Sequence, residues 1–270
     1  MQDIFDTIKA ILLSLGFLVA VFIPLEKLFP ARQHQKIFRP AFWLDICFLL
    51  GQYIIWNSLV LWILNFANPF LDSILPLNIT TVIKTQPWFL QAIEVILLSD
   101  FLIYWGHRFQ HNNNFLWRFH KVHHTAKHLD WLAAHREHPL DTIYTVGIIN
   151  LPALILGFPL ETIAGFVAFR GIWAIYIHSN TKINIGFLKY IFGTPEMHHW
   201  HHDVERDRGN YSNLSPIMDL IFRTHYNPKH QPEKLGLKVE TSKNYIGQLV
   251  IPMLPKFIVG KIKEKEELES

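Results

Sequence analysis

The sequence predicts an all-α protein, an integral membrane helical bundle of about four to five membrane helices with a histidine-rich helical cap on the cytoplasmic side. Three observations predict it. Of the 270 residues, 50% are hydrophobic and only 17% are charged, whereas about a quarter are charged in a typical soluble domain. Apolar segments long enough to span a bilayer alternate with polar connections. Three histidine clusters with helical spacing lie beside those segments.

The composition also excludes several classes of function. The formal net charge is +3, and the basic residues form no stripe with base-stacking aromatic residues, so we expect no nucleic acid partner. The sequence contains no glycine-rich nucleotide-binding loop, which argues against a Rossmann or P-loop cofactor site. A single cysteine, Cys47, excludes an intrachain disulfide and a cluster of cysteine ligands.

The first two predicted membrane helices are residues 8–24 and 41–67. Because acidic residues rather than basic ones precede the first run, we expect it to remain as a helix and not to be cleaved as a signal peptide. The loop 26–40 holds four Lys or Arg residues, whereas the connector 68–88 holds only one. By the positive-inside rule, loop 26–40 is expected on the cytoplasmic side.

The third predicted membrane helix, residues 89–110, returns the chain to the cytoplasmic side. It contains two acids, Glu94 and Asp100, and acids inside a membrane are candidates for a function. Asp100 precedes His107 by seven residues, two turns along the same face. Its carboxylate could orient that imidazole, or it could pair with a Lys or Arg side chain, and the sequence leaves both roles open.

Residues 111–139 form the first part of the predicted cap. Asn112 to Asn114 are expected to end the preceding helix, since short amide side chains favour turns. Residues 115–132 are expected to form an amphipathic helix at the membrane interface. His138 precedes Pro139, at a predicted helix boundary from which its side chain could turn toward a metal.

Two more apolar segments, residues 140–158 and 160–178, are separated only by a turn around Pro159 and predict a tight helical hairpin. Arg170 lies within the second arm, so its guanidinium needs a buried partner or a water-filled cavity. The arm ends at His178, on the expected cytoplasmic side.

Residues 179–225 form the second part of the cap. Thr194, Pro195 and Glu196 predict a helix start, with a hydroxyl at the N-cap, proline in the first turn and an acid beside it. The segment 246–262 contains two prolines and is expected to lie at the interface, and residues 261–270 form a charged, solvated tail. We find no internal repeat, so residues 1–270 are expected to form a single membrane domain.

The histidines suggest a metal site. On a helix, residues four apart share a face, as do residues at i, i+3 and i+4, so three clusters could surround a common point. Neutral imidazole is the commonest metal ligand in proteins. The ten candidate ligands are His107, His111, His120, His123, His124, His138, His178, His198, His201 and His202.

Ten ligand nitrogens correspond roughly to two octahedral ions with open positions, which predicts a dinuclear centre. Soluble di-iron bundles carry two Glu-x-x-His motifs, and this pair is absent because only Glu196 and His199 have that spacing. The ligand type alone does not choose among iron, zinc and manganese, since imidazole suits all three.

These motifs resemble the histidine boxes of the fatty acid hydroxylase/sterol desaturase superfamily. The boxes are His-x-x-x-His at 107–111 and His-x-x-His-His at 120–124 and again at 198–202. The flanking segments also match, and the resemblance covers about residues 89–223. Two positions depart from the usual pattern: Asp141 stands where relatives commonly have Glu, and His199 where Arg is frequent.

The resemblance implies an integral-membrane, non-haem di-iron oxygenase. It implies two iron ions as cofactors, O2 as co-substrate and a membrane lipid as substrate, with hydroxylation and desaturation both open. The chain has no His-Pro-Gly-Gly motif, so an external electron donor is expected, either a separate electron-transfer protein or a reduced cofactor. The expected location is multi-pass in a bacterial inner membrane or the ER membrane, with the metal on the cytoplasmic side.

The resemblance also suggests residues that support the ligands from behind. These are Asp100, Tyr104, Asp141, Asn180, Glu196, Asn210 and Asp219. Two other functions remain as alternatives. One is a metal-dependent lipid hydrolase, in which a metal-bound water attacks an ester. The other is a non-enzymatic divalent-metal carrier, which would be expected to hold its ligands at the bilayer midplane between repeated halves.

Overall fold

The computed structural model describes residues 2–56, 59, 62, 66, 77–156, 158, 160–206, 208–239, 241–255 and 258–259. Every regular element in this part of the chain is a helix, and its only β pairings are two isolated bridges. The all-α prediction is therefore confirmed. Most of the second half of the predicted helix 41–67, and all of the predicted tail 261–270, lie outside the described residues.

The N-terminal helix α1 (Gln2–Leu28) extends beyond the predicted segment 8–24 on both sides, through flanks that also contain charged residues. One stripe of α1 is buried. Leu18 and Phe22 on this stripe pack against Leu49 of the next helix and against Trp131 of the cap. Burial of this stripe therefore fixes α1 against the cap.

The second helix, α2 (Phe42–Gly51), continues directly into a π-helical turn, η1 (Gln52–Trp56). Together they form the described part of the predicted helix 41–67. π-Turns are rare and occur often at functional sites. This one brings Gln52 into the interior of the molecule, where its side chain is buried.

A short helix, α4 (Leu77–Thr85), precedes the longest buried helix, α5 (Trp88–Asn112). Pro87 stands immediately before α5, and proline is favoured next to a helix start because it has no N–H to leave unpaired. As predicted from the three asparagines, α5 ends at Asn112. The extended Asn113 then separates it from the next helix.

The helix α6 (Asn114–His120) is capped by the side-chain oxygen of Asn113, which accepts hydrogen bonds from two backbone N–H groups of its first turn. The prediction of one helix over 115–132 is wrong, because α6 stops at His120. The hydroxyl and backbone N–H of Thr125 both donate to the carbonyl of Val122. This contact tightens the chain into the 3-10 turn η2 (His123–Thr125).

The helices α7 (Pro139–Leu156) and α8 (Leu160–His178) form the predicted hairpin. Of the neighbours of α5, α7 packs most extensively against it, and Gly106 permits the close approach. A Cβ at Gly106 would lie 2.5 Å from Cδ1 of Ile148 on α7. An alanine at this position would require the Ile148 side chain to shift.

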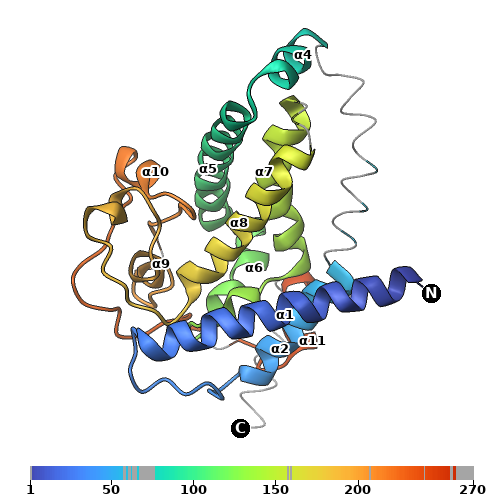
Figure 1. Cartoon of the computed structure of the whole chain (residues 1–270). Helices are drawn as coiled ribbons and strands as arrows, with labels where there is room; N and C mark the ends of the chain where they lie inside the picture. Colours follow the sequence, from blue (N-terminus) through green and yellow to red (C-terminus); the bar gives the residue numbers. More distant parts are fainter. Residues whose placement is uncertain are drawn as a thin grey trace.

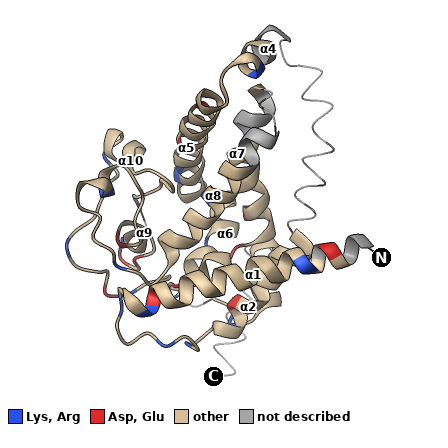
Figure 2. Ribbon diagram, in the orientation of Figure 1, with Lys and Arg blue, Asp and Glu red and all other residues tan. Residues whose placement is uncertain are grey.

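The remaining elements belong mainly to the cap and are short. They are η3 (Ala133–His135), η4 (Gly186–Tyr190), α9 (Pro195–His201), α10 (Ile217–Ile221), α11 (Tyr245–Val250) and η5 (Ile251–Met253). Lys, Arg, Asp and Glu lie mainly on these elements and their loops, whereas long stretches of α1, α5 and α8 are uncharged (Figure 2).

Two of the described helices are long and apolar enough to cross a membrane, namely Ile8–Leu28 and Trp88–Asn112, and the apolar helix Phe42–Trp56 is shorter. In Figure 1, α1 runs across the view while α5 rises steeply. These two helices are therefore not parallel, and they cannot both lie along the normal of one flat bilayer. The number of membrane spans remains a prediction.

A buried network of four charges joins α2 to the cap. The Asp45 carboxylate lies 2.7 Å from Arg39 and 2.5 Å from Arg136, and Arg39 also pairs with Asp130 at 2.5 Å. All four side chains are almost fully buried. Two acids and two bases thus neutralise one another away from water, as buried charges require.

We expect Asp45→Ala to destabilise the protein by about 3–5 kcal/mol, because it leaves two buried guanidinium groups short of a partner. The matched control is Glu205→Ala, whose ion pair with Lys238 is exposed and contributes about 0–1 kcal/mol. Thermal unfolding of the detergent-purified variants measures both. Equal losses would show that the buried network does not hold α2 to the cap.

Candidate metal centre

The structure gathers nine histidines into two groups. Group one consists of His107, His111, His120, His124 and His201, and group two of His123, His178, His198 and His202. Within each group, the ligand nitrogens all lie within 4.8 Å of one another. The two groups are adjacent, since the rings of His124 and His202 stack with centroids 4.4 Å apart. The arrangement therefore offers two neighbouring cation sites.

The ligands come from the ends of four helices and one turn. The C-terminal end of α5 supplies His107 and His111, and the end of α6 with the turn η2 supplies the middle box. His178 is the last residue of α8. The third box lies on α9 and at its C-cap. Figure 1 shows these helix ends meeting at the cap.

The start of α9 follows the sequence prediction. The hydroxyl of Thr194 accepts from the backbone N–H of Met197, and Pro195 occupies the first turn. Because this cap fixes the first turn, the phase of the helix is also fixed. His198 and His202 consequently face group two, whereas His201 faces group one.

Group one has the electronic arrangement of a cation site. Nδ1 of His107 donates to the carbonyl of Tyr211 at 2.7 Å, and Nδ1 of His120 donates to the carboxylate of Asp141 at 3.0 Å. A neutral imidazole that donates from Nδ1 has a bare lone pair on Nε2. The Nε2 atoms of these two rings nevertheless lie 3.0 Å apart. Two lone pairs at that distance repel each other unless a cation lies between them.

Group two repeats this arrangement. Nδ1 of His178 donates to the carbonyl of Ala174 at 2.6 Å, and Nδ1 of His123 donates to the carbonyl of Arg136 at 3.2 Å. Their Nε2 atoms lie 2.8 Å apart. Nε2 of His198 lies a further 2.8 Å from Nε2 of His178. The residues of both groups therefore fit metal ions, since facing bare nitrogens are what a cation requires.

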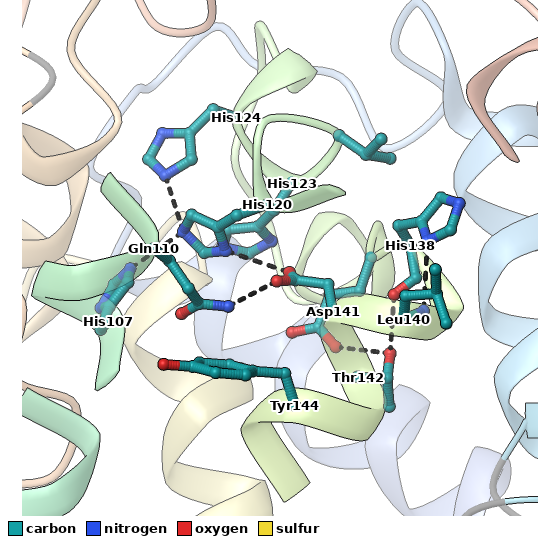
Figure 3. A network of polar contacts seen from close by, with 12 residues as sticks. His107, Gln110, His120, His123, His124, His138, Leu140, Asp141, Thr142 and Tyr144 are labelled. Atoms are coloured by element: carbon teal, nitrogen blue, oxygen red, sulfur yellow. Dashed lines mark hydrogen bonds and ion pairs between the residues drawn. The ribbon is translucent and has the colours of Figure 1, made fainter. Parts of the chain in front are cut away.

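Asp141 anchors group one through two contacts. One carboxylate oxygen accepts from His120, and the other accepts from the amide of Gln110 at 2.5 Å. Figure 3 shows both side chains pointing at Asp141 while His107 and His124 face His120 from the other side. An acid in the outer shell of a metal site fixes the tautomer of the ligand and raises its basicity. The sequence predicted this role for Asp141 but did not indicate Gln110.

Two further ligands are held by backbone carbonyls that the sequence could not indicate. Asp219, a predicted supporting residue, accepts from the N–H of Tyr211, whose carbonyl holds His107. The carbonyl of Gly209 accepts from Nδ1 of His201 at 2.8 Å. Gly209 has φ +104, and a Cβ there would lie 2.7 Å from a backbone oxygen. Only glycine fits this position without strain.

Three other predicted supporting residues lie close to this framework but touch no ligand ring. The hydroxyl of Tyr104 lies 3.1 Å from Thr224. Asn210 holds the loop that follows α9 by donating to the carbonyl of Met197. Asn180 exchanges hydrogen bonds with the backbone of Arg32. These contacts stabilise the chain around the ligands rather than the ligands themselves.

Two supporting roles require correction. Asp100 pairs with Arg170 at 2.8 Å, so the second of its two expected roles is the one found. The same pair supplies the buried partner that Arg170 needs. Glu196 lies 3.8 Å from the half-exposed Lys182, and no hydrogen bond in the described part of the chain joins it to a ligand.

His138 lies outside both groups. Its Nδ1 accepts from the N–H of Leu140 at 3.1 Å, and its Nε2 donates to the carbonyl of Leu249 at 2.9 Å. Both nitrogens are therefore engaged with the backbone, and we omit His138 from the ligand set. The predicted helix boundary before Pro139 is confirmed, since α7 begins at Pro139. The ring of His138, however, points toward α11 and not toward the metal groups.

Both groups open onto one cavity of about 670 Å³. Its lining includes two rings from group one and three from group two. Most of the other lining residues are apolar and come from α1, α5, α7 and α8, among them Phe17, Ile103, Ile149 and Ile172. The cavity can therefore hold a hydrocarbon chain against both candidate cation sites.

Burial keeps His198, His201 and His202 neutral. It lowers the pKa of His201 to about 3, against the opposing effect of the Gly209 carbonyl. Burial and the neighbouring imidazoles lower the pKa of His198 and of His202 well below the usual value. Metal ions bind neutral imidazole, so these rings are ready to bind at neutral pH.

Comparison with known proteins supports the resemblance. Residues 92–224 match the fatty acid hydroxylase family. They include all nine clustered histidines. The chain belongs to this family.

Among its relatives, an ornithine lipid hydroxylase from Rhizobium tropici is 31% identical over 186 residues, which cover 67% of this chain and 56% of the relative. An alkylglycerol monooxygenase from Homo sapiens is 35% identical over 142 residues, covering 52% and 31%. A very-long-chain aldehyde decarbonylase from Oryza sativa subsp. indica is 31% identical over 159 residues, covering 57% of each. The chain thus spans less than two thirds of each relative's length. No solved structure gives a significant match.

The two groups predict separable metal losses. We expect His124→Ala, in group one, and His202→Ala, in group two, each to lower the bound metal from about two ions per chain to about one, since each removes a ligand from one site only. Elemental analysis of the purified protein measures this. The control is His138→Ala, which should keep both ions. A loss in the control as large as that in His124→Ala would return His138 to the ligand set.

The stability of the metal-free protein should depend on pH. His201 has a pKa of about 3 and His199 of about 4 in the folded state, both lowered first by burial, against about 6.5 in an unfolded chain. Below pH 6.5 the unfolded chain therefore takes up protons that the folded chain refuses, so stability falls as the pH drops toward 4. Thermal unfolding between pH 7.5 and 4.5 measures the trend. A constant unfolding temperature would contradict it.

Proposed function

We propose that this protein catalyses the O2-dependent hydroxylation or desaturation of a membrane lipid at a dinuclear, histidine-ligated iron centre. The observation that carries the proposal is the shared cavity. One apolar space of about 670 Å³ is lined by rings from both metal groups. A hydrocarbon chain in this space lies beside two cations at once.

Iron is supported by the ligands and by the relatives. All nine clustered donors are imidazoles, which suit iron but not the hard cations that prefer oxygen. Two relatives are named for hydroxylase and monooxygenase activity on lipids or alkylglycerols. Iron bound here would supply the capacity to activate O2 with two external electrons and to oxidise an alkyl C–H bond.

The residues of the chain provide the conditions for that reaction. The apolar walls formed by α1, α7 and α8 can pack against a hydrocarbon chain and hold the substrate carbon close to the ligands. Asp141 and the carbonyls of Tyr211 and Gly209 keep Nδ1 of their rings protonated. The bare Nε2 atoms are thereby left free to bind iron in the two groups.

We place the enzyme in a membrane, with the metal centre on the cytoplasmic side. The apolar helices α1 and α5 support a membrane location, and the four basic residues of loop 26–40 support the orientation. Electrons would reach the cap from a separate protein or a reduced cofactor on the aqueous side. The carrier alternative is less well supported, since the ligands lie at helix ends.

The decisive experiment supplies 18O2, a chemical reductant and a mixture of membrane lipids to the iron-loaded protein. We expect an alcohol that contains one 18O atom, or an alkene, and no product without oxygen. His178→Ala, in group two, should lower the rate at least about a hundredfold, whereas Tyr190→Phe, half-exposed on η4, should not change it. Product formed without O2 by a zinc-loaded protein would favour the hydrolase alternative.

A further inference from the structure

A second polar cluster, separate from the nine clustered histidines, lines the same cavity. It consists of Gln52 on η1, His135 on η3, Glu137 in the loop before α7, and Thr142 in the first turns of α7. None of these side chains touches a clustered histidine through a hydrogen bond in the described part of the chain. The rest of the cavity wall is mainly apolar, so this cluster distinguishes one region of it.

The hydrogen bonds of the cluster fix which atoms donate. The amide nitrogen of Gln52 and the hydroxyl of Thr142 lie 3.3 and 3.1 Å from the same carboxylate oxygen, Oε2 of Glu137. That oxygen accepts from both, so the amide nitrogen of Gln52 must face it. The carbonyl oxygen of Gln52 therefore faces Nδ1 of His135, at 2.9 Å.

An amide oxygen can only accept, so Nδ1 of His135 carries the proton and its Nε2 is a bare acceptor. This nitrogen is buried and has no hydrogen-bond partner. Oε1 of Glu137, the second carboxylate oxygen, also accepts no hydrogen bond from the described residues. A buried acceptor left without a donor is unfavourable, and such groups in native proteins require an explanation.

We propose that this cluster is a binding subsite for a hydrogen-bond donor on the lipid substrate, either a hydroxyl or an amine. The inference rests on the proposed function, because it identifies the substrate of the same cavity. One donor group can satisfy Nε2 of His135 and, where the Glu137 carboxyl is ionised, Oε1 of Glu137 as well. An ether, an ester or a bare hydrocarbon has no hydrogen-bond donor for His135 or Glu137.

The place of the cluster also limits the substrate. Glu137 lies in the loop before α7 and is close enough to Asp141 to feel its charge, and Asp141 anchors the ligand His120. Burial and the Asp141 carboxylate raise the pKa of Glu137, so a cationic donor would favour its ionised form. The donor group thus lies close to the oxidised carbon, while the hydrocarbon chain extends along the apolar walls. We infer a lipid with a hydroxyl or amine near the reacting position.

The test measures binding rather than turnover. Dodecan-1-ol, dodecylamine and 1-methoxyundecane have similar chain lengths but differ in donor capacity. We expect the alcohol or the amine to bind the purified full-length chain at least about tenfold tighter than the methyl ether, which corresponds to about 1.4 kcal/mol. Microscale thermophoresis without O2 or reductant gives the three dissociation constants.

Two variants locate the effect. His135→Leu should reduce the preference for the donor-bearing probes over the ether to below about threefold, and Glu137→Gln, which keeps the size of the side chain, should remove any preference for the amine over the alcohol. His230→Leu and Glu205→Gln are matched controls at exposed positions and should keep both preferences. If His135→Leu does not fold, the preference of Glu137→Gln for the amine over the alcohol still tests the subsite.

Equal binding of the three probes to the unaltered protein would overturn the proposal, as would preferences that survive in both variants. The result is separate from the proposed function. A protein that prefers the donor-bearing probes but oxidises no lipid retains the subsite and loses the oxygenase role. A protein that oxidises lipids without this preference retains the oxygenase role and loses the subsite.

Discussion

The arrangement of the helix ends is constrained by imidazole rings whose bare nitrogens face one another and repel unless a cation lies between them. Backbone carbonyls and Asp141 hold the protons on the outer nitrogens, and the inner nitrogens of His107 and His120 or of His123 and His178 then meet at 3.0 and 2.8 Å. Such an arrangement is stable only with a cation between the rings. Metal ions bound here would therefore stabilise the fold, because they would hold the ends of α5, α6, α8 and α9 together.

The two His-x-x-His-His boxes each serve both groups. In the first box, His120 and His124 belong to group one while His123 belongs to group two, and in the second box His201 is separated in the same way from His198 and His202. Each box thus links the two cation sites through a single helical turn. A shift of either helix end would disturb both sites together. Hydrogen bonds to the outer nitrogens oppose such a shift, and Gly209 provides one of them through its carbonyl, which accepts from His201.

The cavity extends from the clustered histidines to the apolar helices α1, α5, α7 and α8. Its walls are helices with exposed apolar outer faces, and α1 closes one side through Leu13 and Phe17. Figure 1 shows α1 lying across the direction of α5, so the wall of the cavity is built from helices of different orientation instead of a parallel bundle. The proposed polar subsite lies on this wall close to Asp141, so that a single cavity would fix both the head of the lipid and the carbon to be oxidised.

The sequence by itself determined the helical class, the end of α5 at the asparagines, the capped start of α9 and the nine histidines that cluster. These features depend on neighbours in the chain, on spacing and on side-chain chemistry. Only the tertiary structure decided the division of each box between two groups, the pairing of Asp100 with Arg170 and the exclusion of His138. The end of α6 at His120, within the expected helix 115–132, was likewise decided by the tertiary structure. Each of these depends on contacts between distant segments, often with a backbone carbonyl, and every residue carries a carbonyl, so the sequence cannot indicate which one will be used.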